Sequence, residues 1–141
     1  MSLILEAILT TATPDGGTHI APLGFRREDG FVVLSPFHPS RTLDNLRATG
    51  IAAISHPSDV RVFAGCLTGR RDWPLVPCDR IACGRLAEAL SHSELIVERI
   101  EEDAVRPRFI CREVVQVGLG DSGSRDIRRR QADIGSRRDD L

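Results

Sequence analysis

The chain has 141 residues, 41% of them hydrophobic, and a formal net charge of −1. This length suits one domain with a hydrophobic core, and the near-zero charge excludes the strong basic field typical of nucleic-acid binding. All 19 basic residues are arginine, and the absence of lysine excludes Schiff-base chemistry and P-loop phosphate binding.

The N-terminus carries neither a basic region nor a long apolar segment. We therefore predict no signal peptide, no membrane span and a cytoplasmic location. The 4 cysteines form no CxxC pair, and the 4 histidines show no HExxH or other zinc-ligand spacing. This pattern predicts reduced thiols and no metal centre.

The first part of the chain reads as strands separated by turns. Residues 3–11 and 18–25 are rich in strand-forming residues and flank a turn sequence at 13–17. A second turn at 28–30 leads to another apolar strand at 31–35. The order predicts consecutive antiparallel hairpins.

The second of these strands contains two residues that are unusual in a strand interior. Pro22 cannot donate to a strand ladder, which indicates an edge or a bulge. Gly24 permits the close approach of another backbone or of a flat ligand. A bent barrel strand with no ligand explains both residues equally well.

A short helix is predicted between the apolar strands at 31–35 and 51–55. Ser40 or Thr42 can cap its N-terminus, and Gly50 can end it in the left-handed conformation. The free N–H groups at its start, with Arg41 and Asn45, would suit a phosphate. The alternative is a capped crossover helix with an exposed arginine, and the local residues alone favour that alternative.

The second half of the chain is less regular. Residues 60–64 fit either a strand or a helical turn, and residues 65–77 form an irregular loop containing the single Trp. That loop is either functional or a lid-like segment pinned by Trp73 in a hydrophobic groove. We predict three further strands at 81–90, 94–102 and 108–117, separated by breaks at 91–92 and 103–107. The first of them is rich in Ala and Leu and could instead be helical.

The composition changes near residue 121. Residues 121–141 contain six arginines and five aspartates, which is too polar a mixture to bury a core. We therefore predict a domain at 1–120 followed by a solvated tail at 121–141. The GxGxxG match at 118–123 is accidental, because too few residues follow it to complete a dinucleotide-binding βαβ unit.

Four groups of residues carry a resemblance to a known family. They are, in chain order, Glu6 with Thr10-Thr11; His19-Ile20-Ala21-Pro22-Leu23-Gly24; Pro36-Phe37 with Ser40, Thr42 and Asn45-Leu46; and Asp59-Val60 with Val62-Phe63-Ala64. In this order they resemble uncharacterised flavoproteins of the FMN-binding split-barrel superfamily, related to flavin reductases and pyridoxamine-phosphate oxidases. The run at 62–74 is similar to a bacterial branch found beside methanopterin-linked one-carbon genes.

The resemblance, which covers residues 4–117, implies a mostly β fold: a six-stranded antiparallel barrel with short helices that forms a homodimer with FMN at the interface. The positions that it implies for phosphate and ribityl binding are Ser40, Arg41, Thr42 and Asn45. The backbone of His19, Ala21, Pro22, Leu23 and Gly24 would face the isoalloxazine ring. Asp59 and Phe63 would stand near the flavin, and Trp73 would close the site or the dimer contact.

After about residue 117 the chain departs from the family pattern, which continues with a Gly-Phe-Asn-Arg-Ala-like segment and helices. We interpret the charged tail as a truncated or frame-altered C-terminus, which would reduce FMN affinity if the missing helices cover the flavin.

The functional hypothesis is an FMN-dependent oxidoreductase of unknown substrate, linked by family association to methanopterin-dependent one-carbon metabolism. The rival hypothesis is a module that binds FMN or a related phosphate-bearing cofactor without turnover. No catalytic acid, base or nucleophile is named, because the sequence has no Ser/His/Asp order, paired carboxylates or reactive-cysteine context. The flavin would carry the redox chemistry.

Overall fold

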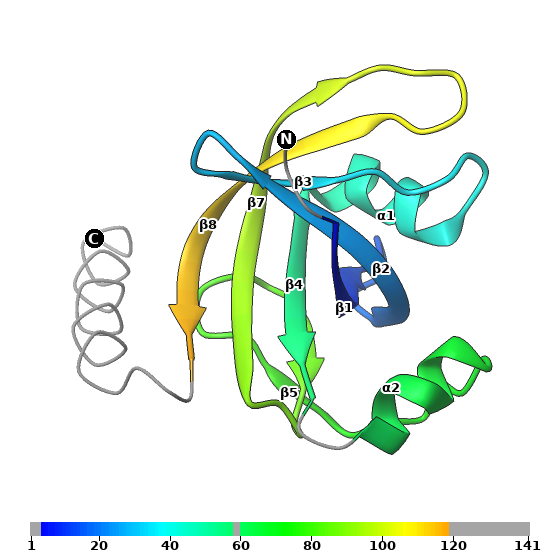
Figure 1. Ribbon diagram of the computed structural model, residues 1–141, viewed down its shortest axis with the longest axis vertical. Coiled ribbons are helices and arrows are strands. Elements are labelled where there is room, and N and C mark those ends of the chain that lie inside the picture. Colours follow the sequence, from blue (N-terminus) through cyan, green and yellow to red (C-terminus); the bar gives the residue numbers. More distant parts are fainter. Residues whose placement is uncertain (1–3, 58–59, 119–141) are drawn as a thin grey trace.

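The computed structural model describes residues 4–57 and 60–118. Six strands close into an antiparallel barrel in the order β1-β2-β3-β8-β7-β4 (Figure 1). They are β1 (Leu5–Ala12), β2 (Thr18–Glu28), β3 (Phe31–Leu34), β4 (Ile51–His56), β7 (Ser91–Glu101) and β8 (Arg108–Val117). The prediction of a mostly β, six-stranded antiparallel barrel is confirmed.

The barrel interior follows from the alternation of side chains along each strand. In β1, Ala7 and Leu9 point into the main core, whereas Ile8 packs on the outer side in a separate cluster. Phe109 and Leu95 fill the interior from β8 and β7, and both are fully buried. The two-residue period of the strands therefore produces two apolar layers, one inside the barrel and one outside β1 and β2.

Helix α1 (Arg41–Thr49) connects β3 to β4 and has the caps that the sequence predicts. The side chain of Ser40 accepts a hydrogen bond from the Leu43 N–H at 3.1 Å. Gly50 ends the helix with φ of 70°, in the left-handed region that favours glycine. Leu43 and Leu46 join the main core, so α1 packs over one end of the barrel.

Helix α2 (Val60–Leu67) forms where the sequence left strand and helix open. Val62 and Cys66, one helical turn apart, pack with Ile8 and Ile20 outside the barrel. Both helices lie on the side of the barrel formed by β1 and β2 (Figure 1). The segment forms a helix because its apolar residues, spaced one helical turn apart, can pack on the apolar outer face of β1 and β2.

The loop after α2 is held against this outer cluster by Trp73. A Cβ on Gly65 would lie 2.5 Å from the Trp73 ring, so only glycine allows the indole to lie against the helix. The Arg70 guanidinium stacks on the other part of the indole, 3.9 Å from its centroid. This arrangement matches the pinned-loop alternative raised from the sequence.

Two of the later sequence predictions are wrong. Residues 81–90 form a strand only at β6 (Gly84–Leu86), which pairs with the unexpected β5 (Leu75–Pro77) in a separate two-stranded sheet. The expected break at 91–92 lies inside β7, because Ser91 and His92 pair with His56 and Ser55 of β4. Tertiary pairing overrides the weak strand preference of these polar residues.

Among the described residues, no helix is long and apolar enough to cross a membrane. The tail predicted at 121–141 and the candidate residue Asp59 lie outside the described residues.

Candidate functional site

The first turn of α1 is docked onto the end of the β1–β2 hairpin. Thr11 of β1 lies opposite His19 of β2 in the strand register. The Asn45 side chain reaches from α1 and donates a buried hydrogen bond from Nδ2 to Thr11 Oγ1 at 3.1 Å. Because Asn45 is only 4% exposed, this bond fixes the position of the helix start relative to His19.

The start of α1 presents free backbone donors. The first intrahelical hydrogen bond runs from Asp44 N–H to Ser40 C=O at 3.1 Å. The N–H groups of Arg41 and Thr42 precede that bond and point out of the helix start, at the positive end of the helix dipole. Thr42 is buried while Arg41 is exposed, so the arginine side chain is the one available to a ligand.

Two arginines concentrate positive charge beside His19. Partial burial lowers the pKa of His19, and the nearby charges of Arg41 and Arg71 lower it further. Arg71 is held after α2 by a 2.7 Å hydrogen bond from its Nη1 to the Cys66 carbonyl oxygen. The start of α1 and the loop after α2 therefore contribute one arginine each whose charge acts on His19, an arrangement suited to binding an anion.

A cavity of about 480 Å³ lies beside this helix start, lined by Thr13, Pro14, Asp15, Arg41, Asp44 and Asn45. Its two carboxylates would repel a phosphate placed next to them, but carboxylates accept hydrogen bonds from hydroxyl groups. Arginine, by contrast, binds phosphate in its planar fork. The lining therefore suits a ligand that carries a phosphate at one end and hydroxyl groups farther along.

The strand that carries His19 has an open edge. In the part of the chain that the structure describes, β2 pairs with β3 only from Phe25 onward, so residues 18–24 are bonded to β1 alone. Pro22 lies in this open stretch, opposite Ile8, where its missing N–H costs no ladder bond. The opening leaves backbone groups free to face a ligand or another chain.

The other residues singled out from the sequence lie in different surroundings. Leu23 packs against the main core, and Ala21 is half-buried in the open stretch of β2. Gly24 faces Ile4 and Glu6, and it lines a separate cavity of about 430 Å³. Trp73 belongs to the outer cluster beside α2. Phe63 lies within α2, but its side chain is outside the described residues.

The structure adds Arg71, which the sequence reasoning did not select. The Arg-Arg-Asp-Trp run was the available signal, because two adjacent arginines beside the single Trp are unusual in a structural loop. Nothing in the sequence, however, distinguishes the role of Arg70 from that of Arg71. Arg70 pairs with Asp72 at 2.6 Å and stacks on Trp73, whereas Arg71 donates to the Cys66 carbonyl oxygen and its charge acts on His19.

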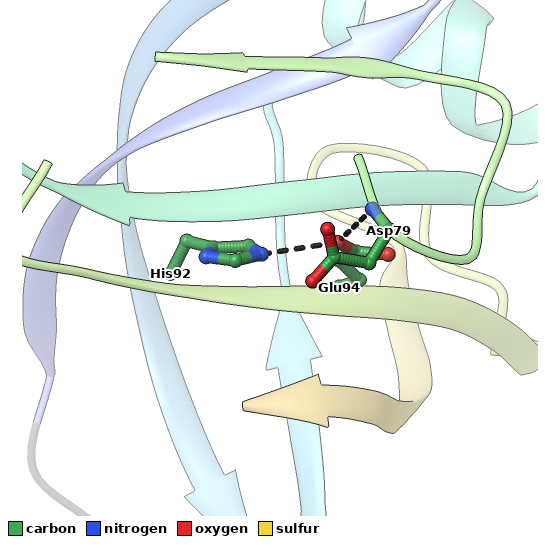
Figure 2. A group of neighbouring side chains, drawn as sticks. All are labelled: Asp79, His92 and Glu94. Atoms are coloured by element: carbon green, nitrogen blue, oxygen red, sulfur yellow. Dashed lines mark hydrogen bonds and ion pairs between the residues drawn. The ribbon is translucent and has the colours of Figure 1, made fainter. Parts of the chain in front are cut away.

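A second polar cluster, Asp79, His92 and Glu94, offers side-chain atoms close enough to bind a metal ion (Figure 2). The Glu94 carboxylate is fully buried and already accepts from four donors. These are the N–H groups of Asp79 at 2.6 Å, Arg80 at 2.7 Å and Ile81 at 3.3 Å, and His92 Nε2 at 3.0 Å. With both oxygens engaged in this way, the cluster is explained as an anchor for the turn before β6.

Solved structures with the same fold include several flavin proteins. Nitrilotriacetate monooxygenase component B from Bacillus cereus superposes with a TM-score of 0.70 at 15% identity, covering 82% of this chain and 69% of that one. An FMN-bound protein from Methanosarcina mazei, assigned to DUF447, superposes with a TM-score of 0.67 at 16% identity, covering 80% of this chain and 59% of that one. The 2-nitrobenzoate 2-nitroreductase of Pseudomonas fluorescens superposes with a TM-score of 0.67 at 18% identity, covering 80% of this chain and 64% of that one.

These likenesses show the shared barrel fold. The chain spans less than two thirds of the length of the Methanosarcina protein and of the nitroreductase. No curated protein matches the chain. The model for the N-terminal domain of a protein family of unknown function, DUF447, matches residues 5–118, and the chain therefore belongs to this family.

Proposed function

We propose that this protein binds FMN, with the phosphate at the start of α1, and acts as a flavin-dependent oxidoreductase. The observation that carries the proposal is the cavity at the α1 start, where Arg41 lies beside the free N–H groups of the helix and where Arg41 and Arg71 both act on His19. A phosphate group has both the charge and the acceptor oxygens that these donors require.

The surrounding residues fit the remainder of FMN. Asn45 and the cavity beside Arg41 offer acceptors for the hydroxyl groups of a ribityl chain. The open stretch of β2 offers unpaired backbone along which a flat ring can lie. When bound, the flavin supplies hydride or electron transfer, and these residues bind and orient it.

The known proteins with this fold support the proposal. The Methanosarcina mazei protein of the same family is FMN-bound, and a styrene monooxygenase flavin reductase from Pseudomonas putida also has the fold. A link to methanopterin-dependent one-carbon metabolism is a finer hypothesis, supported by the resemblance of residues 62–74 alone.

We propose also that two copies associate along the open stretch of β2. Residues 18–24 have no strand on their outer side in the described part of the chain, and a neighbouring subunit would cover them. Leu67, which is 61% exposed, adds apolar surface at the end of α2. Sedimentation of the protein with and without FMN would measure this association.

The visible spectrum of the purified protein tests the function. We expect FMN added to the protein to bind and to show a shifted flavin absorption band, and anaerobic NADH or NADPH to bleach that band. Protein that takes up no FMN would contradict the flavin proposal. Bound flavin that neither nucleotide reduces would contradict nicotinamide-dependent turnover and favour a module that binds FMN only.

The titration of His19 gives a second test that does not depend on turnover. In the free protein, burial and the two arginines hold the pKa of His19 below its usual value of 6.5. A bound phosphate dianion would offset the arginine charges, so we expect FMN to raise the pKa of His19. Imidazole resonances followed by NMR against pH would measure the change.

A further inference from the structure

Cys78 and Cys83 face each other across the turn that joins β5 to β6. Pro77 and Gly84 are the last paired residues of that small sheet, and the two cysteines occupy the next opposing positions. The N–H of Cys78 donates to the Cys83 carbonyl oxygen at 2.9 Å, which holds the two residues opposite each other. Residues that oppose one another in antiparallel strands have the Cα separation that a disulfide needs.

The turn between the two cysteines is rigidly held. The N–H groups of Asp79, Arg80 and Ile81 all donate to the buried Glu94 carboxylate, as described above. Because this anchor fixes the backbone between positions 78 and 83, the two cysteines keep their opposing positions without an added constraint. The pairing was not evident from the sequence, where the spacing between these cysteines matches no redox motif.

The two thiols also differ in character. The interaction between the two neighbouring thiols lowers the pKa of Cys83 and raises the pKa of Cys78, and the Cys83 S–H also donates to the Gly84 carbonyl oxygen at 3.3 Å. The Glu94 carboxylate opposes ionisation of both thiols. Cys83 is therefore the sulfur that reaches the thiolate form first, and the thiolate is the attacking species in disulfide exchange.

A cavity gives small molecules access to Cys83. The cavity has a volume of about 490 Å³ and a mainly apolar lining that includes Leu75, Val76, Pro77 and Ile81 besides the cysteine. The other two thiols are enclosed: Cys66 and Cys111 are both fully buried. Burial raises the pKa of Cys66, and it raises the pKa of Cys111 to about 12.

We propose that Cys78 and Cys83 form a reactive dithiol that exchanges with small, uncharged disulfides and closes into an intramolecular disulfide. The Cys83 thiolate attacks one sulfur of the small disulfide, forms a mixed disulfide and releases the first small thiolate. The Cys78 thiol then loses its proton and attacks the Cys83 sulfur, releasing the second thiolate. The protein is oxidised by two electrons, and the small disulfide is reduced to two thiols.

The uncharged aromatic reagent 4,4′-dithiodipyridine tests this sequence in the whole, folded protein. We expect one equivalent to release two equivalents of thiopyridone, to leave no label on the protein and to join Cys78 to Cys83 in non-reducing peptide maps. This reaction should be at least about tenfold faster than labelling of Cys66 and Cys111. A retained label in the wild type, or equal reaction of all four cysteines, would overturn the proposal.

Conservative variants separate the two roles. Cys78→Ser should release one thiopyridone and keep the label on Cys83, because the second attack is lost. Cys83→Ser should lose the fast phase, whereas Cys111→Ser, a matched change at an enclosed thiol, should keep it. Circular dichroism would establish that each variant is folded. Release of two thiopyridones by Cys78→Ser, or a fast phase in Cys83→Ser, would also overturn the proposal.

Discussion

Replacing Glu94 with alanine is expected to lower the free energy of unfolding by about 3 kcal/mol. The change leaves three backbone N–H groups of the 79–81 turn and His92 Nε2 without their acceptor. Water can reach the exposed residues Asp79 and Arg80, but Ile81 and His92 are buried, and an unpaired buried donor is costly. Urea denaturation followed by circular dichroism would measure the loss.

Glu98 in the same strand provides the matched control. Its carboxylate pairs with Arg112 at 3.0 Å, but both side chains are about half exposed, so Glu98→Ala should change the stability by less than about 1 kcal/mol. Equal effects of the two substitutions would contradict the anchoring role of Glu94.

The same anchor gives the stability a defined pH dependence. Burial raises the pKa of Glu94, but the hydrogen bonds from His92 and from the Asp79 and Arg80 N–H groups outweigh it and leave the pKa below the usual 4.5. A carboxyl group whose pKa is depressed by folding stabilises the protein above the unfolded-state value and loses that effect as the pH falls. The difference between wild type and Glu94→Ala should therefore be full above pH 4.5 and shrink below it.

Replacing Arg41 and Arg71 together with alanine is expected to weaken FMN binding by roughly 100- to 10,000-fold. Each arginine would donate charge-assisted hydrogen bonds to the phosphate, and such bonds contribute about 1.5–3 kcal/mol apiece. Since both arginines act on the same histidine, the two losses should be similar in size. Fluorescence titration with FMN would measure the affinity.

Riboflavin, which lacks the phosphate, is the matched ligand for this experiment. The double variant should bind riboflavin as the wild type does, so that the preference for FMN over riboflavin disappears. Arg112→Ala, a surface arginine paired with Glu98, should leave both affinities unchanged. A double variant that keeps the wild-type preference for FMN would show that the phosphate binds elsewhere.

The strands and helices could be predicted wherever neighbouring residues all favoured the same structure. The turn at 13–17, the alternation around Leu9 and the caps Ser40 and Gly50 each determine their own structure, and these elements appear as expected. The prediction of a strand over residues 81–90 was wrong because their Ala- and Leu-rich composition has no strong local preference for one secondary structure. Their conformation is decided by a distant carboxylate, Glu94, that binds the turn at 79–81.

The candidate site was predictable only in its local part. A capped helix start with Arg41 and Asn45 is visible in the sequence because capping depends on residues three or four apart. The contributions of His19 and Arg71 required the barrel, because they come from β2 and from the loop after α2. The same limit applies to Cys78 and Cys83, whose pairing depends on the β5–β6 register.

The sequence by itself determined the antiparallel hairpins of the first three strands, the capped helix after β3 and a start of that helix suited to an anion. These features follow from the two-residue period of strands and from capping, which act over a few neighbouring residues. Only the tertiary structure decided which charges surround the helix start, that Trp73 packs on Gly65, and which thiols meet. Each of these depends on contacts between distant segments, because strand register and barrel closure bring them together.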